Sequence, residues 1–176
     1  MNSLLKQFIE KNINLIEDNN FNELYNLIDY QLVSSLTQVL YKANINPLLF
    51  IEAIPFEFAY HTDWADPLIP GNIHRIGTKA FMFTPLNSLK IEEGCDYIGN
   101  TAFANCRQLE SIQLPKSLLE IGQAAFFACP LKYIKYNGTQ ADWCNIAKGK
   151  TWVSPTTLAS LTIECLDGLY NPQGDN

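Results

Sequence analysis

The residues best suited to bind a metal ion are His61, Asp63 and Asp66, which lie within six positions of one another. Imidazole and carboxylate groups are ligands for several divalent metals. Their spacing matches no common metal-binding motif, and the segment lies where an N-terminal helical region would meet the rest of the chain. We therefore interpret it as a polar connecting loop and predict no metal and no cofactor. A metal-dependent enzyme is the least favoured function.

Cysteine is the other residue type that could supply reactive chemistry, and the chain contains five. Cys95, Cys106 and Cys129 fall at repeat positions that belong to a core, where cysteine behaves as a small hydrophobic residue. A nucleophilic thiol needs a lowered pKa and a nearby base, and the sequence indicates neither. No CxxC pair, phosphate-binding loop, dinucleotide fingerprint or nucleophile elbow occurs. The sequence therefore predicts no catalytic residues and no enzymatic activity.

Composition and charge narrow the class of protein further. Of 176 residues, 47% are hydrophobic and 17% are charged, which is typical of a folded chain. The net charge of −6 arises within residues 1–66, which hold nine acidic residues and three lysines, whereas residues 67–176 are neutral. Binding to nucleic acid calls for clustered Lys and Arg, so we predict no nucleic-acid partner.

The distribution of apolar residues bears on location. The first twenty residues carry charges throughout and lack the apolar run of a signal peptide. No stretch approaches the roughly 18 apolar residues that a membrane span needs. We expect no membrane association, a cytoplasmic location in the producing or host cell, and cysteines that remain thiols.

Two dipeptides recur in phase along the middle of the chain. Ile-Gly occurs at 76–77, 98–99 and 121–122, and Ala-Phe occurs at 80–81, 102–103 and 125–126, with steps of 22 and 23 residues. Such steps are typical of leucine-rich repeats. Apolar residues alternate with polar ones where the repeats join, which predicts one short strand per repeat. The phenyl rings of the Ala-Phe dipeptides should enter a common core. Each repeat has an apolar face that it cannot bury alone, so successive repeats must stack.

The consensus IPxxxxxIGxxAFxxCxxL resembles the BspA-like class of leucine-rich repeats, which occurs in bacterial surface proteins and in some phage-encoded proteins. Residues 136–168 are similar to the segment that often closes such arrays. The chain departs from the pattern at Thr84, where Cys is usual, and at Glu93-Gly94, where a Pro is missing. The resemblance implies a binding scaffold and brings no catalytic residues.

We predict an α+β fold in which a short leucine-rich-repeat solenoid of about three repeats is covered by an N-terminal helical bundle. Residues 1–60 form the acidic helical region, beginning with a single helix over SLLKQFIEKNINLIED. Residues 61–168 form the solenoid, closed by a cap over 136–168 that buries Trp143, Ile146 and Trp152. Residues 169–176 are expected to be disordered. The helices either dock on the first repeat or form an independent module, which would allow a homodimer through them.

Residues between the buried strand positions should point outwards on the concave face of the solenoid. A tyrosine, two lysines and small polar groups could contact a partner protein there. The alternative is that they are only the solvated face of a sheet. We refer to this set as the polar strip: Ser88, Lys90, Glu92, Ser111, Gln113, Tyr133 and Lys135.

The function that follows from this reading is a non-enzymatic protein–protein interaction module whose partner the sequence does not identify. A phage-type protein that binds and modulates a host protein is a special case of it. The alternative is a structural or adhesive component of a virion or cell surface.

Overall fold

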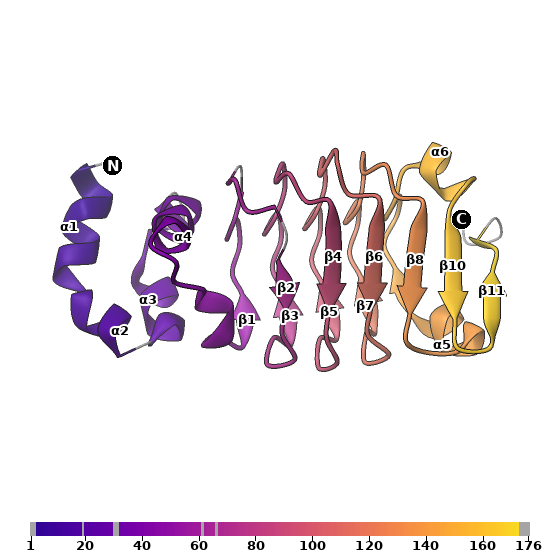
Figure 1. Cartoon of the computed structure of the whole chain (residues 1–176), viewed down its shortest axis with the longest axis horizontal. Helices are drawn as coiled ribbons and strands as arrows, with labels where there is room; N and C mark the ends of the chain where they lie inside the picture. The colour runs from indigo at the N-terminus through magenta and orange to yellow at the C-terminus, as the bar shows by residue number, and fades with distance from the viewer. Residues whose placement is uncertain (1–2, 19, 30–31, 61, 66, 173–176) are drawn as a thin grey trace.

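The computed structural model describes residues 3–18, 20–29, 32–60, 62–65 and 67–172. Within them, a group of short helices leads into two sheets of mainly parallel strands, which the chain builds by winding repeatedly about one axis (Figure 1). The result is an α+β solenoid of about four turns with helices at its N-terminal end, which confirms the predicted fold class.

The N-terminal helices are shorter than the sequence suggested. Instead of one long first helix, α1 (Ser3–Lys11) and α2 (Ile13–Glu17) are separated at Asn12. The Asn12 side chain donates a hydrogen bond to the carbonyl of Phe8 (2.8 Å), and such local bonds compete with helical ones. The remaining helices of this region are α3 (Phe21–Leu27), α4 (Val33–Lys42) and the 3₁₀ turn η2 (Pro47–Leu49). No helix among the described residues is long and apolar enough to cross a membrane.

Each turn of the solenoid contributes one strand to each of two sheets (Figure 1). Sheet A contains, within the described residues, β1 (Ala53–Ile54), β3 (Arg75–Ile76), β5 (Tyr97–Ile98), β7 (Glu120–Ile121) and β9 (Ala147–Lys148), all parallel. Sheet B contains β2 (Leu68–Ile69), β4 (Ser88–Ile91), β6 (Ser111–Leu114), β8 (Tyr133–Tyr136), β10 (Thr162–Cys165) and β11 (Gly168–Tyr170).

The recurring Ile-Gly dipeptide sets the spacing of the turns. Ile76, Ile98 and Ile121 occupy matching positions in neighbouring strands of sheet A and are fully buried. The glycine that follows each isoleucine lies against the backbone of the preceding turn. A Cβ on Gly99 would come within 2.7 Å of the Gly77 carbonyl carbon, so only glycine allows the turns to approach this closely.

The recurring Ala-Phe dipeptide forms the aromatic core. Phe81, Phe103 and Phe126 are fully buried, and each ring stacks on the next at 5.2 Å with the planes 2° apart. Phe58 extends the stack at the N-terminal end (5.9 Å from Phe81), and Trp152 closes it at the other end (6.4 Å from Phe126). Stacking the turns thus buries one continuous column of rings.

The solenoid begins one turn earlier than the repeats indicated, because its first turn departs from the consensus. Pro55 stands where later turns have glycine, and Phe58-Ala59 reverses the usual Ala-Phe order. The backbone pairing nevertheless follows the repeat, since Ile54 pairs with Ile76 and the N–H of Ala59 donates to the carbonyl of Ala80 (2.6 Å).

The N-terminal helices pack directly on this first turn. The Tyr25 ring of α3 lies 5.3 Å from Phe58, and Trp64 contacts both Phe58 (5.7 Å) and Tyr41 of α4 (5.2 Å). Buried side chains from Leu5 to Cys165 form a single hydrophobic cluster. The helices therefore cover the apolar end that an uncapped solenoid would expose.

The C-terminal end is covered by α5 (Gln140–Asn145), the last turn and α6 (Pro155–Leu158). Trp143, Ile146 and Trp152 are buried there, and the two tryptophan rings lie 6.0 Å apart. The expectation of a disordered tail is wrong for residues 169 and 170, which belong to β11 and pair antiparallel with β10. The edge of β10 offers hydrogen-bonding groups, and Gly168 (φ +131°) permits the sharp reversal. Residues 173–176 of the predicted tail lie outside the described part of the chain.

Candidate functional site

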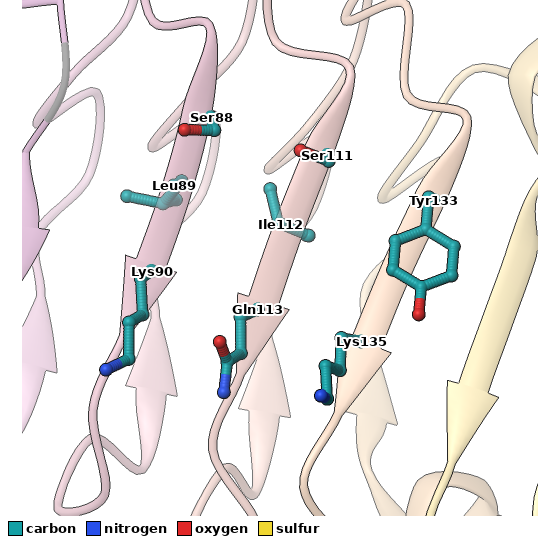
Figure 2. A pocket seen from close by; sticks show the side chains of 8 residues that line it. All are labelled: Ser88, Leu89, Lys90, Ser111, Ile112, Gln113, Tyr133 and Lys135. Atoms are coloured by element: carbon teal, nitrogen blue, oxygen red, sulfur yellow. The ribbon is translucent and has the colours of Figure 1, made fainter.

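The register of sheet B places the polar strip on one outward face. Ser88 of β4, Ser111 of β6 and Tyr133 of β8 occupy matching positions, and so do Lys90, Gln113 and Lys135 two residues further on (Figure 2). Successive side chains of a strand point to opposite faces, so both rows project away from the core while Leu89, Ile112 and Ile134 are buried. Glu92 follows β4 directly and is half-buried.

A shallow depression of about 270 Å³ lies between the two rows (Figure 2). It is smaller than the roughly 300–1,000 Å³ of typical small-molecule sites, so it suits a single protruding side chain of a partner better than an enclosed substrate. The short serine side chains leave the space open, with Tyr133 at one end. Its lining comprises Ser88, Leu89, Lys90, Ser111, Ile112, Gln113, Tyr133 and Lys135.

The polar groups of the strip are only partly engaged with one another. Lys90 lies 3.5 Å from the carboxylate of Glu92, and the Gln113 side-chain amide donates to the Asn137 side-chain oxygen (3.2 Å). Within the described residues, no acidic side chain forms an ion pair with Lys135. The exposed side chain of Lys135, next to the neutral amide of Gln113, is therefore available to a partner.

Tyr133 is held by a residue that the sequence reasoning missed. Its hydroxyl donates to the carboxylate of Glu164 on β10, and this hydrogen bond raises the pKa of Tyr133 above its ordinary value. The register pairs Glu164 with Lys135, so the row of Lys90, Gln113 and Lys135 continues into an acidic residue. Apolar and polar residues alternate over 161–165, which is typical of a strand, but a single sequence offers no direct signal for the register of that strand against β8.

Glu93 has a structural position rather than a catalytic one. Its carboxylate accepts hydrogen bonds from the backbone N–H groups of Lys116 (2.9 Å) and Ser117 (3.1 Å) in the next turn. Desolvation acts to raise the pKa of Glu93, but these hydrogen bonds outweigh it and the pKa is lowered. The carboxylate thus joins two turns at the place where the usual proline is missing.

The repeated cysteines lie in the core. Cys106 and Cys129 each donate a hydrogen bond to a phenylalanine carbonyl of a preceding turn (3.2 and 3.1 Å), and Thr84 lies in line with them, 3.4 Å from the sulfur of Cys106. The Cys106 thiol and burial raise the pKa of Cys129, and burial raises that of Cys95 to about 12. Neither Cys95 nor Cys129 supplies a thiolate near neutral pH.

Residues 61–66, the candidate metal-binding segment, are described only in part. His61 and Asp66 lie outside the described residues. Asp63 is exposed, lies 3.9 Å from Lys42, and accepts a hydrogen bond from the Gln38 side chain (3.3 Å). In the remainder that the structure describes, no three His, Cys, Asp or Glu side chains are grouped so as to hold a metal ion.

Stacked turns of about 22 residues, parallel strands in two sheets and a column of buried rings define a leucine-rich-repeat solenoid. A family model for the BspA type leucine rich repeat region (6 copies) matches residues 57–146. The chain belongs to this family. No curated protein and no solved structure gives a match.

Membership of the family defines the coarse class of function. BspA-type leucine-rich repeats are interaction or adhesion modules that generally lack enzymatic activity, and they typically bind other proteins. The matched region starts within the first turn, at residue 57, and therefore includes part of the divergent turn that the repeated dipeptides did not indicate.

Proposed function

We propose that this chain is a non-enzymatic protein-binding module that holds its partner on the polar strip of sheet B. The observation that carries the proposal is the in-register presentation of two rows of accessible polar side chains by β4, β6 and β8 (Figure 2). Tyrosine is enriched among the residues that dominate binding energies at protein interfaces. Lys90 and Lys135 place positive charge on either side of Gln113 in the other row.

The solenoid makes this surface well suited to binding. The strands that carry the strip are paired on both sides, and their alternate side chains are anchored in the core. A surface that is already ordered loses little conformational entropy on association, so more of the contact energy appears as affinity. Hydrogen bonds to Glu164 and Asn137 further restrict Tyr133 and Gln113.

Two narrower hypotheses follow from this proposal. In one, a phage-type protein uses the strip inside a host cell to modulate a host protein. In the other, the strip belongs to a structural or adhesive component of a virion or cell surface. The location of the captured partner separates them, because an intracellular partner supports the first and an exposed surface component supports the second.

The proposal is tested by affinity capture from lysate of the native host, comparing the wild-type chain with Lys90→Glu/Tyr133→Ala/Lys135→Glu. We expect a partner that the wild type retains and the triple variant loses. A matched control, Lys132→Glu, changes a lysine that pairs with Glu110 outside the strip and should retain the partner. Retention by all three chains, once circular dichroism shows that they fold alike, would place the interface elsewhere and contradict the proposal.

A further inference from the structure

Neighbouring turns are joined outside the sheets by a repeated pair of backbone hydrogen bonds. Two N–H groups, two residues apart, donate to two carbonyl groups of the following turn. In the last such pair, Ala124 donates to Lys150 (3.2 Å) and Phe126 donates to Trp152 (2.7 Å). The preceding turn does the same from Thr101 to Gln123 (2.9 Å) and from Phe103 to Ala125 (2.8 Å).

The final turn presents the same two donors, and within the described residues no further turn stacks on them. Thr151 and Val153 occupy the positions of Ala124 and Phe126, and Thr151 has the same left-handed backbone as Ala124 (φ +49° and +53°). Among the hydrogen bonds of the described residues, none comes from the N–H of either residue. Val153 is only 2% exposed, so its N–H is removed from much of the solvent, and no described residue accepts a hydrogen bond from it. Unpaired edge donors of this kind are templates for a further strand.

Sheet A ends at β9, beside these donors, whereas sheet B continues through β10 and β11 (Figure 1). A cavity of about 360 Å³ occupies the space where the next turn would stack. The indole N–H of Trp152, one of its lining residues, is also buried without a hydrogen-bond partner in the described part of the chain. The lining comprises Lys148, Gly149, Lys150, Thr151, Trp152, Val153 and Leu158.

We propose that this end of sheet A binds an extended, acidic peptide segment of a partner protein, which adds to the last turn as a strand. Two carbonyl groups of the peptide, two residues apart, accept from the N–H groups of Thr151 and Val153, as each turn does for the one before. Apolar side chains of the peptide enter the cavity. The positive charge of the exposed Lys150 at its edge favours a carboxylate in the occupant. The Lys148 ammonium instead donates to the carbonyls of Trp143 (2.8 Å) and Ile146 (3.2 Å).

A second copy of the chain is a poor occupant. The first turn of the solenoid is the surface that would continue the stack, and the N-terminal helices cover it through Tyr25 and Tyr41. Residues 1–66 do carry the negative charge that the site favours. However, the N-terminal helices share the core with the first turn and would have to detach before that turn could pair with a second copy. A separate extended peptide meets no such obstacle.

The test uses the full chain and a capped peptide with the sequence of residues 120–128, EIGQAAFFA, which supplies the required pair of carbonyls in its own turn. In the register of the preceding turns, its glutamate would lie beside Ala147, three residues before Lys150. In the free chain, the amides of Thr151 and Val153 should exchange with solvent much faster than those of Ala124 and Phe126. On adding the peptide, both should become protected, whereas a scrambled peptide should have no effect.

Charge variants sharpen the result. Lys150→Glu should weaken peptide binding about fivefold, because it reverses an exposed charge beside the site, while Lys132→Glu, remote from it, should leave the affinity unchanged. The proposal is overturned if Thr151 and Val153 are already protected in the free chain, or if the peptide fails to bind at millimolar concentration. Protection of these amides by self-association, seen as a concentration-dependent dimer in sedimentation, would also overturn it.

Discussion

At the scale of single residues, Cys95 shows how a potentially reactive thiol can serve only to pack the hydrophobic core. Its thiol is fully buried between the two sheets and donates to the carbonyl of Tyr97 (3.6 Å). Burial raises its pKa from 9.0 to about 12, because a thiolate would lose its hydration. The residue therefore contributes packing and is protonated at neutral pH.

This shift predicts a loss of stability at alkaline pH. Above pH 9 the unfolded chain releases the Cys95 proton while the folded chain retains it, so the free energy of unfolding should fall between pH 9 and about 12. Urea unfolding at a series of pH values measures this decline. Cys95→Ala should show a shallower decline, whatever its stability at pH 7. An equally steep decline in the variant would mean that other groups, such as Tyr136, account for it.

The residues of the polar strip were accessible to sequence reasoning because a strand alternates with period two. Once Leu89, Ile112 and Ile134 are assigned to the core, the residues between them must face outwards. The residues that hydrogen-bond to the strip could not be predicted in the same way. The contact of Tyr133 with Glu164 spans 31 positions and depends on the register of β10 against β8, for which a single sequence offers no direct signal.

At the scale of structural elements, two glycines with similar backbone conformations have different surroundings. Gly94 (φ +124°) lies against the preceding turn, so an added Cβ would come within 2.2 Å of the Gly71 carbonyl oxygen. Gly168 (φ +131°) forms the reversal before β11, where the nearest atom is the Gln140 side-chain nitrogen at 3.4 Å. The first is constrained by stacking and by backbone strain, and the second by strain alone.

Alanine substitutions at these two positions should therefore separate the two effects. We expect Gly168→Ala to cost about 1–3 kcal/mol, the usual range for a strained backbone, and Gly94→Ala to cost distinctly more, because the turns must also move apart. Denaturant unfolding of both variants measures the difference. Equal costs would show that the close stacking at Gly94 is not important for stability.

The sequence predicted the regular elements better than the irregular ones. Turns that carry Ile-Gly and Ala-Phe in phase were recognised, whereas the first turn was not, since Pro55 and Phe58-Ala59 replace both dipeptides. Its strand nevertheless pairs with β3 in the register of the later turns. The break at Asn12 reflects local competition for hydrogen bonds, whereas β11 forms by pairing with β10. Hydrophobic periodicity reports neither effect.

At the scale of the whole molecule, one core extends from the N-terminal helices to the C-terminal cap. Trp64 lies where helices and solenoid meet, and Trp143 and Trp152 lie at the opposite end. Repeat proteins are stabilised by contacts between neighbours, so a continuous core favours cooperative unfolding in a chain of this length.

We therefore expect the ends of the molecule to unfold together. Two variants test this, one that keeps only Trp64 and one that keeps only Trp152, with the other tryptophans replaced by Phe. In each variant, the fluorescence transition in urea should coincide with the unfolding transition that circular dichroism records for the same variant. If Trp64 fluorescence changes at clearly lower urea than the circular dichroism of the same variant, while Trp152 fluorescence does not, the helices form an independent module.

We propose that the polar strip is the surface that contacts a partner protein. Site-specific photo-crosslinking tests it most directly, with a benzophenone amino acid placed at Gln113 in the strip or at Glu120, an exposed residue of sheet A. We expect a crosslinked partner protein from Gln113 in native-host lysate and none from Glu120. Crosslinking from Glu120 alone would contradict it.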